Sequence, residues 1–173
     1  MSGSTTPATP ATASAPAPLT SELRTQFDAL RAQYPAEMKT SLVLPLLHCL
    51  QAARGHVTEA DAALVADYIG MPTMPVVEAL HWYTMFYKQP VGRHVVKVCR
   101  NIACALRGSE SLIGHVQKSL GIAPGETTAD GRFTLLTVEC LASCGTAPAM
   151  QINDTYHESL DAAKVDAILR SLP

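Results

Sequence analysis

The spacing of apolar residues along the first half of the chain predicts helices. Leu23, Phe27, Leu30 and Tyr34 recur at intervals of three and four residues, which is the period of an amphipathic helix. The same spacing, with glycine or proline as punctuation, recurs three more times before residue 89. Short connections between four such helices are typical of an antiparallel bundle. The predicted helices cover residues 21–34, 40–54, 58–70 and 73–87, within a helical bundle over 20–89.

The pattern changes after residue 89. His94 begins a run of β-branched residues that is typical of a buried strand, and similar short runs follow further along the chain. Two amphipathic segments separate or follow these strands, so this part reads β-α-β-β-β-α. The chain is therefore predicted to be α+β, with a helical bundle followed by a small α/β domain over residues 90–173. The predicted strands are 94–98, 133–138, 148–153 and 155–157, and the predicted helices are 109–120 and 162–172.

The first residues have a composition of their own. Residues 1–19 consist of Ala, Pro, Thr, Ser and Gly apart from an apolar residue at each end, without a charged or aromatic side chain. Such a segment buries too little apolar surface to offset the entropy lost on ordering. We therefore expect residues 1–19 to be a disordered tail without chemistry.

Composition and charge exclude several functions. The chain is 47% hydrophobic and 16% charged, which allows a sizeable core, and its net charge of −2 without a Lys/Arg cluster argues against nucleic-acid binding. No apolar run is long enough to cross a bilayer and no secretory signal is recognisable, so a cytoplasmic protein without membrane insertion is expected. No glycine-rich phosphate loop follows a strand and no paired carboxylates stand out, so neither a nucleotide site nor acid–base catalysis is expected.

The cysteines are the candidate chemistry. In the cytosol thiols stay reduced, so clustered cysteines are better interpreted as metal ligands or redox groups than as structural disulfides. Cys99 and Cys104 enclose four residues, Cys140 and Cys144 enclose three, and each pair directly follows a predicted strand. Both loops can therefore converge on a zinc ion, a 2Fe-2S cluster or a redox dithiol. These gaps favour a cluster over zinc, whose knuckles prefer two-residue gaps, and Cys49 is interpreted as a buried apolar residue.

The segments around these cysteines resemble a known family. They are Cys99 to Ser109, Gly125 to Leu135 and Glu139 to Pro148, and the stretches 45–55 and 84–94 are also similar. The resemblance is to the NuoE-type subunit of respiratory NADH dehydrogenase, complex I, a thioredoxin-like 2Fe-2S ferredoxin family. It extends over about residues 20–173.

This resemblance implies a fold, a cofactor and partners. It implies a thioredoxin-like ferredoxin domain after the bundle and one 2Fe-2S cluster on Cys99, Cys104, Cys140 and Cys144. The chain would be an electron-transfer subunit of an oxidoreductase, without a complete active site of its own. Its partners would be a flavoprotein subunit that holds FMN and NADH close to the cluster, and further iron–sulfur subunits. Through that complex it would be peripheral to the inner membrane.

Other assignments and one departure from the family stay open at this stage. Small diaphorase subunits of NAD-reducing hydrogenases and gamma subunits of NAD-dependent formate dehydrogenases share the four-cysteine frame. A zinc-stabilised interaction module is the alternative of a different class. Ala142 stands where the family often has glycine, so we expect one restricted backbone approach to the cluster. Arg100 and Arg107 are expected to place positive charge near the first cysteine pair.

Overall fold

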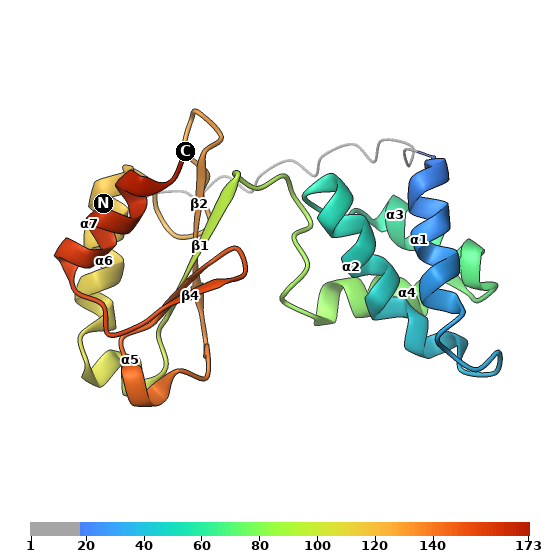
Figure 1. Cartoon of the computed structure of the whole chain (residues 1–173), viewed down its shortest axis with the longest axis horizontal. Helices are drawn as coiled ribbons and strands as arrows, with labels where there is room; N and C mark the ends of the chain where they lie inside the picture. The colour runs from blue at the N-terminus through green and yellow to red at the C-terminus, as the bar shows by residue number, and fades with distance from the viewer. Residues whose placement is uncertain (1–17) are drawn as a thin grey trace, which may run out of the picture. The chain divides into compact units, whose positions relative to one another are not determined.

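The computed structural model describes residues 18–173, which form two compact units that divide after Pro90 (Figure 1). The tail predicted over residues 1–19 therefore lies, for residues 1–17, outside the described residues. Within the described part no helix combines the length and apolarity that a membrane span requires.

The first unit is helical. Its elements are α1 (Ser21–Arg31), a 3-10 helix (Lys39–Leu42), α2 (Val43–Arg54), α3 (Glu59–Ile69) and α4 (Thr73–Trp82). The core of this unit contains Phe27, Leu46, Leu50 and Leu80, all completely buried. Side-chain caps begin two of the helices: Thr20 accepts from the amide of Leu23, and Thr58 forms a reciprocal capping box with Asp61.

Two helices end earlier than the apolar spacing predicts. Helix α1 ends at Arg31 and not at residue 34, and α4 ends at Trp82, so the prediction of a helix up to residue 87 was wrong. The following segment, residues 83–87, is held by the Gln51 side chain, which donates to the carbonyl of Met85 and accepts from the amide of Tyr87, at 3.0 and 2.7 Å. Because these backbone groups find partners outside a helix, the chain can leave the helix and still bury Phe86.

The second unit is a four-stranded sheet with helices. It contains β1 (His94–Cys99), α5 (Ile102–Leu106), α6 (Ser109–Leu120), β2 (Phe133–Val138), β3 (Met150–Ile152), β4 (Thr155–His157) and α7 (Ala162–Ser171). The strand order is β2-β1-β3-β4, with β1 parallel to β2 and antiparallel to β3. Helices α6 and α7 contact one another, and α6 contacts β1 and β2, as Figure 1 shows. The α+β class is therefore confirmed, whereas the short helix α5 was not predicted.

The core of the second unit lies between the sheet and helices α6 and α7. Val96, Leu135 and Met150 contribute from the strands, and Val116 and Val165 from the helices, all completely buried. At the start of β1 the backbone crosses close to β2. There the amide of Gly92 donates to the Thr134 hydroxyl at 2.6 Å. A Cβ at position 92 would lie 2.8 Å from the carbonyl carbon of Phe133, so this position has no room for a side chain.

Candidate metal centre

The ends of two parallel strands bring the cysteine loops together. In the register of β1 and β2, Cys99 is opposite Val138, and the amide of Arg100 donates to the carbonyl of Val138 at 3.0 Å. Cys140 follows Val138 by two residues, so both cysteine pairs begin at the same edge of the sheet. The sequence predicted this convergence correctly, because the carboxyl ends of parallel strands share one edge.

Cys99 and Cys104 are buried and interact with one another. Their exposed fractions are 3% and 2%, and both belong to a small apolar cluster with Leu141, Ala147 and Ala149. Helix α5 carries Cys104 back toward Cys99 within one turn. Burial is the main reason why the pKa of the Cys104 thiol is raised above its ordinary value, and the hydrogen bond with Cys99 raises it further. A metal ion that binds Cys104 therefore has to displace the thiol proton.

The second cysteine pair is exposed. Cys144 begins a 3-10 helix, Cys144–Thr146, and interacts electrostatically with Cys104. Cys140 Sγ accepts a hydrogen bond from the amide of Ala142 at 3.2 Å. Ala142 has φ +59°, in the left-handed region that glycine prefers. The amide of Ala142 therefore lies close to this sulfur, and the alanine has an unfavourable backbone conformation. That Ala142 restricts a backbone approach to the cluster stays a prediction.

The donor set fits an iron–sulfur cluster in its chemistry. Four thiols stand on two loops at one sheet edge, and a backbone N–H already points at one sulfur, as the negative charge of cluster thiolates requires. Across residues 18–173, no group of three or more His, Cys, Asp or Glu side chains is placed to hold a single metal ion. Cys49 lies in the helical unit, half-buried, and its thiol donates to Gln26 Oε1 at 3.0 Å. Cys49 therefore packs against the helical core, and it is partly buried where the sequence predicted a buried residue.

An ion pair that the sequence reasoning missed connects the two loops. Arg100 follows Cys99, Glu139 precedes Cys140, and Arg100 Nε donates to Glu139 Oε1 at 3.0 Å. The positive charge of Arg100 is therefore paired, although its side chain is exposed. Arg107 is exposed as well. Two residues of the second loop interact with Glu158. Hydrogen bonds from the side chains of Thr146, the larger contribution, and Ser143 lower the pKa of the Glu158 carboxyl. The signal for the ion pair was present in the opposite charges that directly follow two neighbouring strands.

Helix α5 also presents an apolar surface beside the cysteines. Ile102 and Leu106 are one helical turn apart, and 73% and 82% of their surfaces are exposed. They flank Cys104, which points inward from the same helix. Five residues are too few for a periodic pattern, so the sequence alone did not distinguish an exposed from a buried face here.

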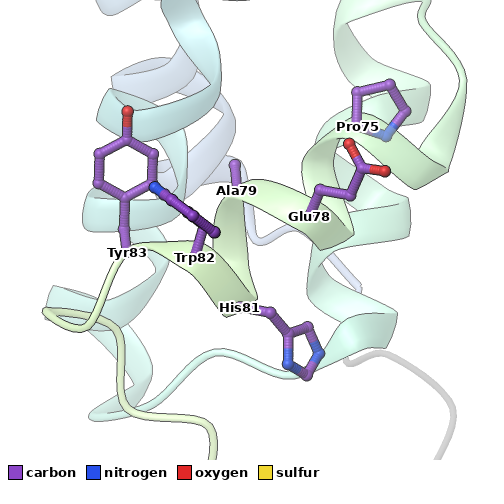
Figure 2. A pocket seen from close by; sticks show the side chains of 6 residues that line it. All are labelled: Pro75, Glu78, Ala79, His81, Trp82 and Tyr83. Carbon is purple, nitrogen blue, oxygen red and sulfur yellow. The ribbon is translucent and has the colours of Figure 1, made fainter.

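A separate groove of about 540 Å³ lies on the helical unit, around the end of α4. Figure 2 shows Trp82 and Tyr83 beside one another, with His81 pointing away from them. Trp82 is 82% exposed, and His81 Nε2 lies 2.9 Å from Glu59 Oε1. The groove contains none of the four cysteines, so it is distinct from the candidate metal centre.

Comparison with known proteins assigns the family. The sequence model that describes the thioredoxin-like 2Fe-2S ferredoxin family matches residues 27–173 of this chain. The chain belongs to this family. The resemblance inferred from the cysteine segments is thereby confirmed, and so is the thioredoxin-like ferredoxin fold of the second unit.

Several curated proteins are similar over most of the chain. An E-type subunit of the NADH-quinone oxidoreductase of Rhizobium meliloti is 43% identical over 149 residues, which are 86% of this chain and 88% of the relative. The E-type subunit of Rickettsia prowazekii is 41% identical over 79% of this chain and 78% of its own length. Flavoprotein 2 of the mitochondrial NADH dehydrogenase (ubiquinone) of Dictyostelium discoideum is 37% identical over 89% of this chain and 63% of its own.

A solved structure of a hydrogenase is also similar. It is an air-oxidised NAD⁺-reducing NiFe hydrogenase, with a TM-score of 0.64 and 26% identity over 75% of this chain. The match covers only 22% of that hydrogenase chain, so this ferredoxin corresponds to one part of a longer polypeptide.

Proposed function

We propose that this chain is the electron-transfer subunit of an NADH dehydrogenase and carries one 2Fe-2S cluster on Cys99, Cys104, Cys140 and Cys144. The observation that carries the proposal is the meeting of these two cysteine loops at the shared carboxyl edge of β1 and β2. Membership of a 2Fe-2S ferredoxin family and relatives named as subunits of NADH-quinone oxidoreductase support it.

The residues around the cysteines suit a site that exchanges electrons with a partner. When bound, the cluster supplies reversible one-electron redox chemistry. Cys99 and Cys104, with Leu141, Ala147 and Ala149, form a dry inner side. Cys140 and Cys144 form an exposed outer side, from which an electron donor can approach.

The proposed partner is the flavoprotein subunit that binds FMN and NADH, within a complex that contains further iron–sulfur subunits and lies at the inner membrane. Ile102 and Leu106 give this partner an apolar contact surface beside Cys104, because exposed apolar side chains gain most when a partner covers them. We expect loops 99–108 and 140–148 to line this interface.

The cluster assignment is tested by colour and by single substitutions. The purified chain should be reddish-brown, with visible absorption and two irons for each chain, as its 2Fe-2S content requires. Replacing Cys99, Cys104, Cys140 or Cys144 with serine should weaken or abolish this absorption, because an oxygen ligand poorly replaces a soft thiolate. Cys49→Ser is the matched control and should leave the spectrum intact. A colourless chain with one stoichiometric zinc would show a zinc-stabilised module instead.

The partner assignment is tested by association. Arg107→Glu should weaken binding to the flavoprotein subunit or shift the cluster potential, because it reverses an exposed charge beside the cysteine loops. Deleting residues 2–18 should do neither. If the deletion abolished complex formation while Arg107→Glu had no effect, the proposed interface would be wrong.

A soluble complex is the second candidate. The likeness to an NAD⁺-reducing hydrogenase favours a small diaphorase subunit of such a hydrogenase or of a formate dehydrogenase. Affinity purification of the native complex separates the two candidates. Quinone-module subunits should accompany the chain in a respiratory complex, and hydrogenase or formate dehydrogenase subunits in the alternative.

A further inference from the structure

The ion pair between Arg100 and Glu139 occupies an unusual place in the second unit. Arg100 is the residue after Cys99, and Glu139 is the residue before Cys140, so each charge is one residue from a candidate ligand. The Arg100 guanidinium contacts one carboxylate oxygen of Glu139 through both Nε and Nη2. The pair therefore joins the two cysteine loops through their side chains, next to the backbone hydrogen bond from Arg100 to Val138.

Stability does not account for this pair. The side chains of Arg100 and Glu139 are 56% and 77% exposed, and ion pairs in such positions contribute about 0–1 kcal/mol. Long-range electrostatics is different, because each charge is carried by the residue next to a candidate ligand, and salt screens exposed charges strongly only beyond about 8–10 Å. The positive and the negative charge act on the site with opposite signs and nearly cancel while they are paired.

We propose that the Arg100–Glu139 pair tunes the reduction potential of the cluster by holding two opposite charges in balance beside its ligands. This inference rests on the proposed function, since it requires a cluster on the four cysteines. Reduction adds one electron, and hence one negative charge, to a group that is already an anion. A positive charge nearby stabilises the reduced form, and a negative charge destabilises it. Arg100 and Glu139 thus act on the reduction potential through their charges, without binding the cluster themselves.

The test is a charge cycle on the full-length chain, with the midpoint potential measured by spectroelectrochemical titration. Arg100→Gln leaves Glu139 unbalanced and should lower the potential, whereas Glu139→Gln leaves Arg100 unbalanced and should raise it. The double variant should return close to the wild-type value. Both single shifts should shrink as salt concentration rises, because salt screens exposed charges.

Two control variants separate charge from structure. Asp154→Asn removes the same charge as Glu139→Gln, but Asp154 lies in the β3–β4 turn, at the opposite end of the sheet from Cys99. This distance is roughly 17 Å along β1, beyond the screening length, so the potential should not move. Arg100→Lys keeps the charge and changes the hydrogen-bond geometry, so it should keep the wild-type potential.

The outcomes are distinct. Opposite shifts that cancel in the double variant support the inference. Shifts of the same sign, no shift, or an equal shift for Arg100→Lys and Arg100→Gln would overturn it. Loss of the cluster from both neutral variants but not from Arg100→Lys would show a purely structural pair and overturn it as well. A wild-type chain that binds no cluster would overturn the proposed function itself, and this inference with it.

Discussion

Ala142 is the position where a single methyl group should reduce the stability of the second unit. Its φ of +59° places an L-residue in the left-handed region, directly beside Cys140. The methyl group is exposed, so its removal sacrifices no packing. We therefore predict that Ala142→Gly stabilises this unit.

The size of the effect follows from two opposing contributions. Glycine avoids the left-handed penalty of about 1–2 kcal/mol that an L-residue has in this conformation. It also raises the entropy of the unfolded chain, which offsets about 0.4–1 kcal/mol. With the central value of each range, the net gain in unfolding free energy is about 0.8 kcal/mol, or a rise in Tm of roughly 3–6 °C for a unit of this size.

A matched alanine in the same unit provides the control. Ala167 is exposed in the middle of α7, where glycine should lower the unfolding free energy by about 1 kcal/mol. The same chemical change should therefore have opposite signs at the two positions. Hydrogen exchange of the β1 amides measures the stability of the second unit, and α2 amides in the same sample measure the first.

The result that refutes this reasoning is a loss of β1 protection in Ala142→Gly similar to that in Ala167→Gly. That result would mean that the methyl group contributes packing, or that the left-handed conformation of the loop carries no penalty. Protection of the α2 amides should remain unchanged in both variants.

Three further predictions concern other parts of the chain. Gly92→Ala should destabilise the second unit by about 1–3 kcal/mol, because its Cβ would lie 2.8 Å from the Phe133 backbone. A lower urea midpoint checks this, and an unchanged midpoint contradicts it. Thr58→Ala should lower the unfolding free energy of the helical unit by about 1–2 kcal/mol through loss of the α3 capping box, as seen in faster exchange of α3 but not β1 amides. The His115 hydrogen bond lowers the pKa of Asp166, so its stabilisation should be present above about pH 4 and disappear as pH falls through the folded pKa. Asp166→Asn should therefore melt below wild type at pH 7, and the difference should vanish in acid.

Strands β1 and β2 were predictable because both are six-residue runs rich in β-branched and other apolar residues, most of them buried. Residues 133–138 form β2 with the predicted bounds, and 94–98 needed only Cys99 to complete β1. Once both strands are known, parallel pairing brings the two cysteine loops to one edge. That all four sulfurs bind one cluster remains a prediction, because it rests on the spacing and the family and not on a contact among all four.

The missed features depend on contacts between residues far apart in the sequence. Residues 83–87 look helical by their apolar spacing, but the side chain of Gln51, more than thirty positions earlier, binds their backbone. The Arg100–Glu139 pair likewise requires the register of β1 on β2, which composition does not contain. Helix α5 is too short for its period to be recognised, so the exposure of Ile102 and Leu106 became visible only in the fold.

The unequal burial of the two cysteine pairs has a consequence for the protein outside its complex. Thiol reagents and peroxides act on sulfurs they can reach, and solvent reaches Cys140 and Cys144 while Cys99 and Cys104 are covered. Oxidative damage should therefore begin in loop 140–148, and short alkylation of cluster-free chain should label that loop first. Newly made chains should consequently be oxidised first on the side that the proposed partner would cover. Early assembly of the complex would then protect the cysteine site from oxidation as well as bring it into contact with the partner subunit.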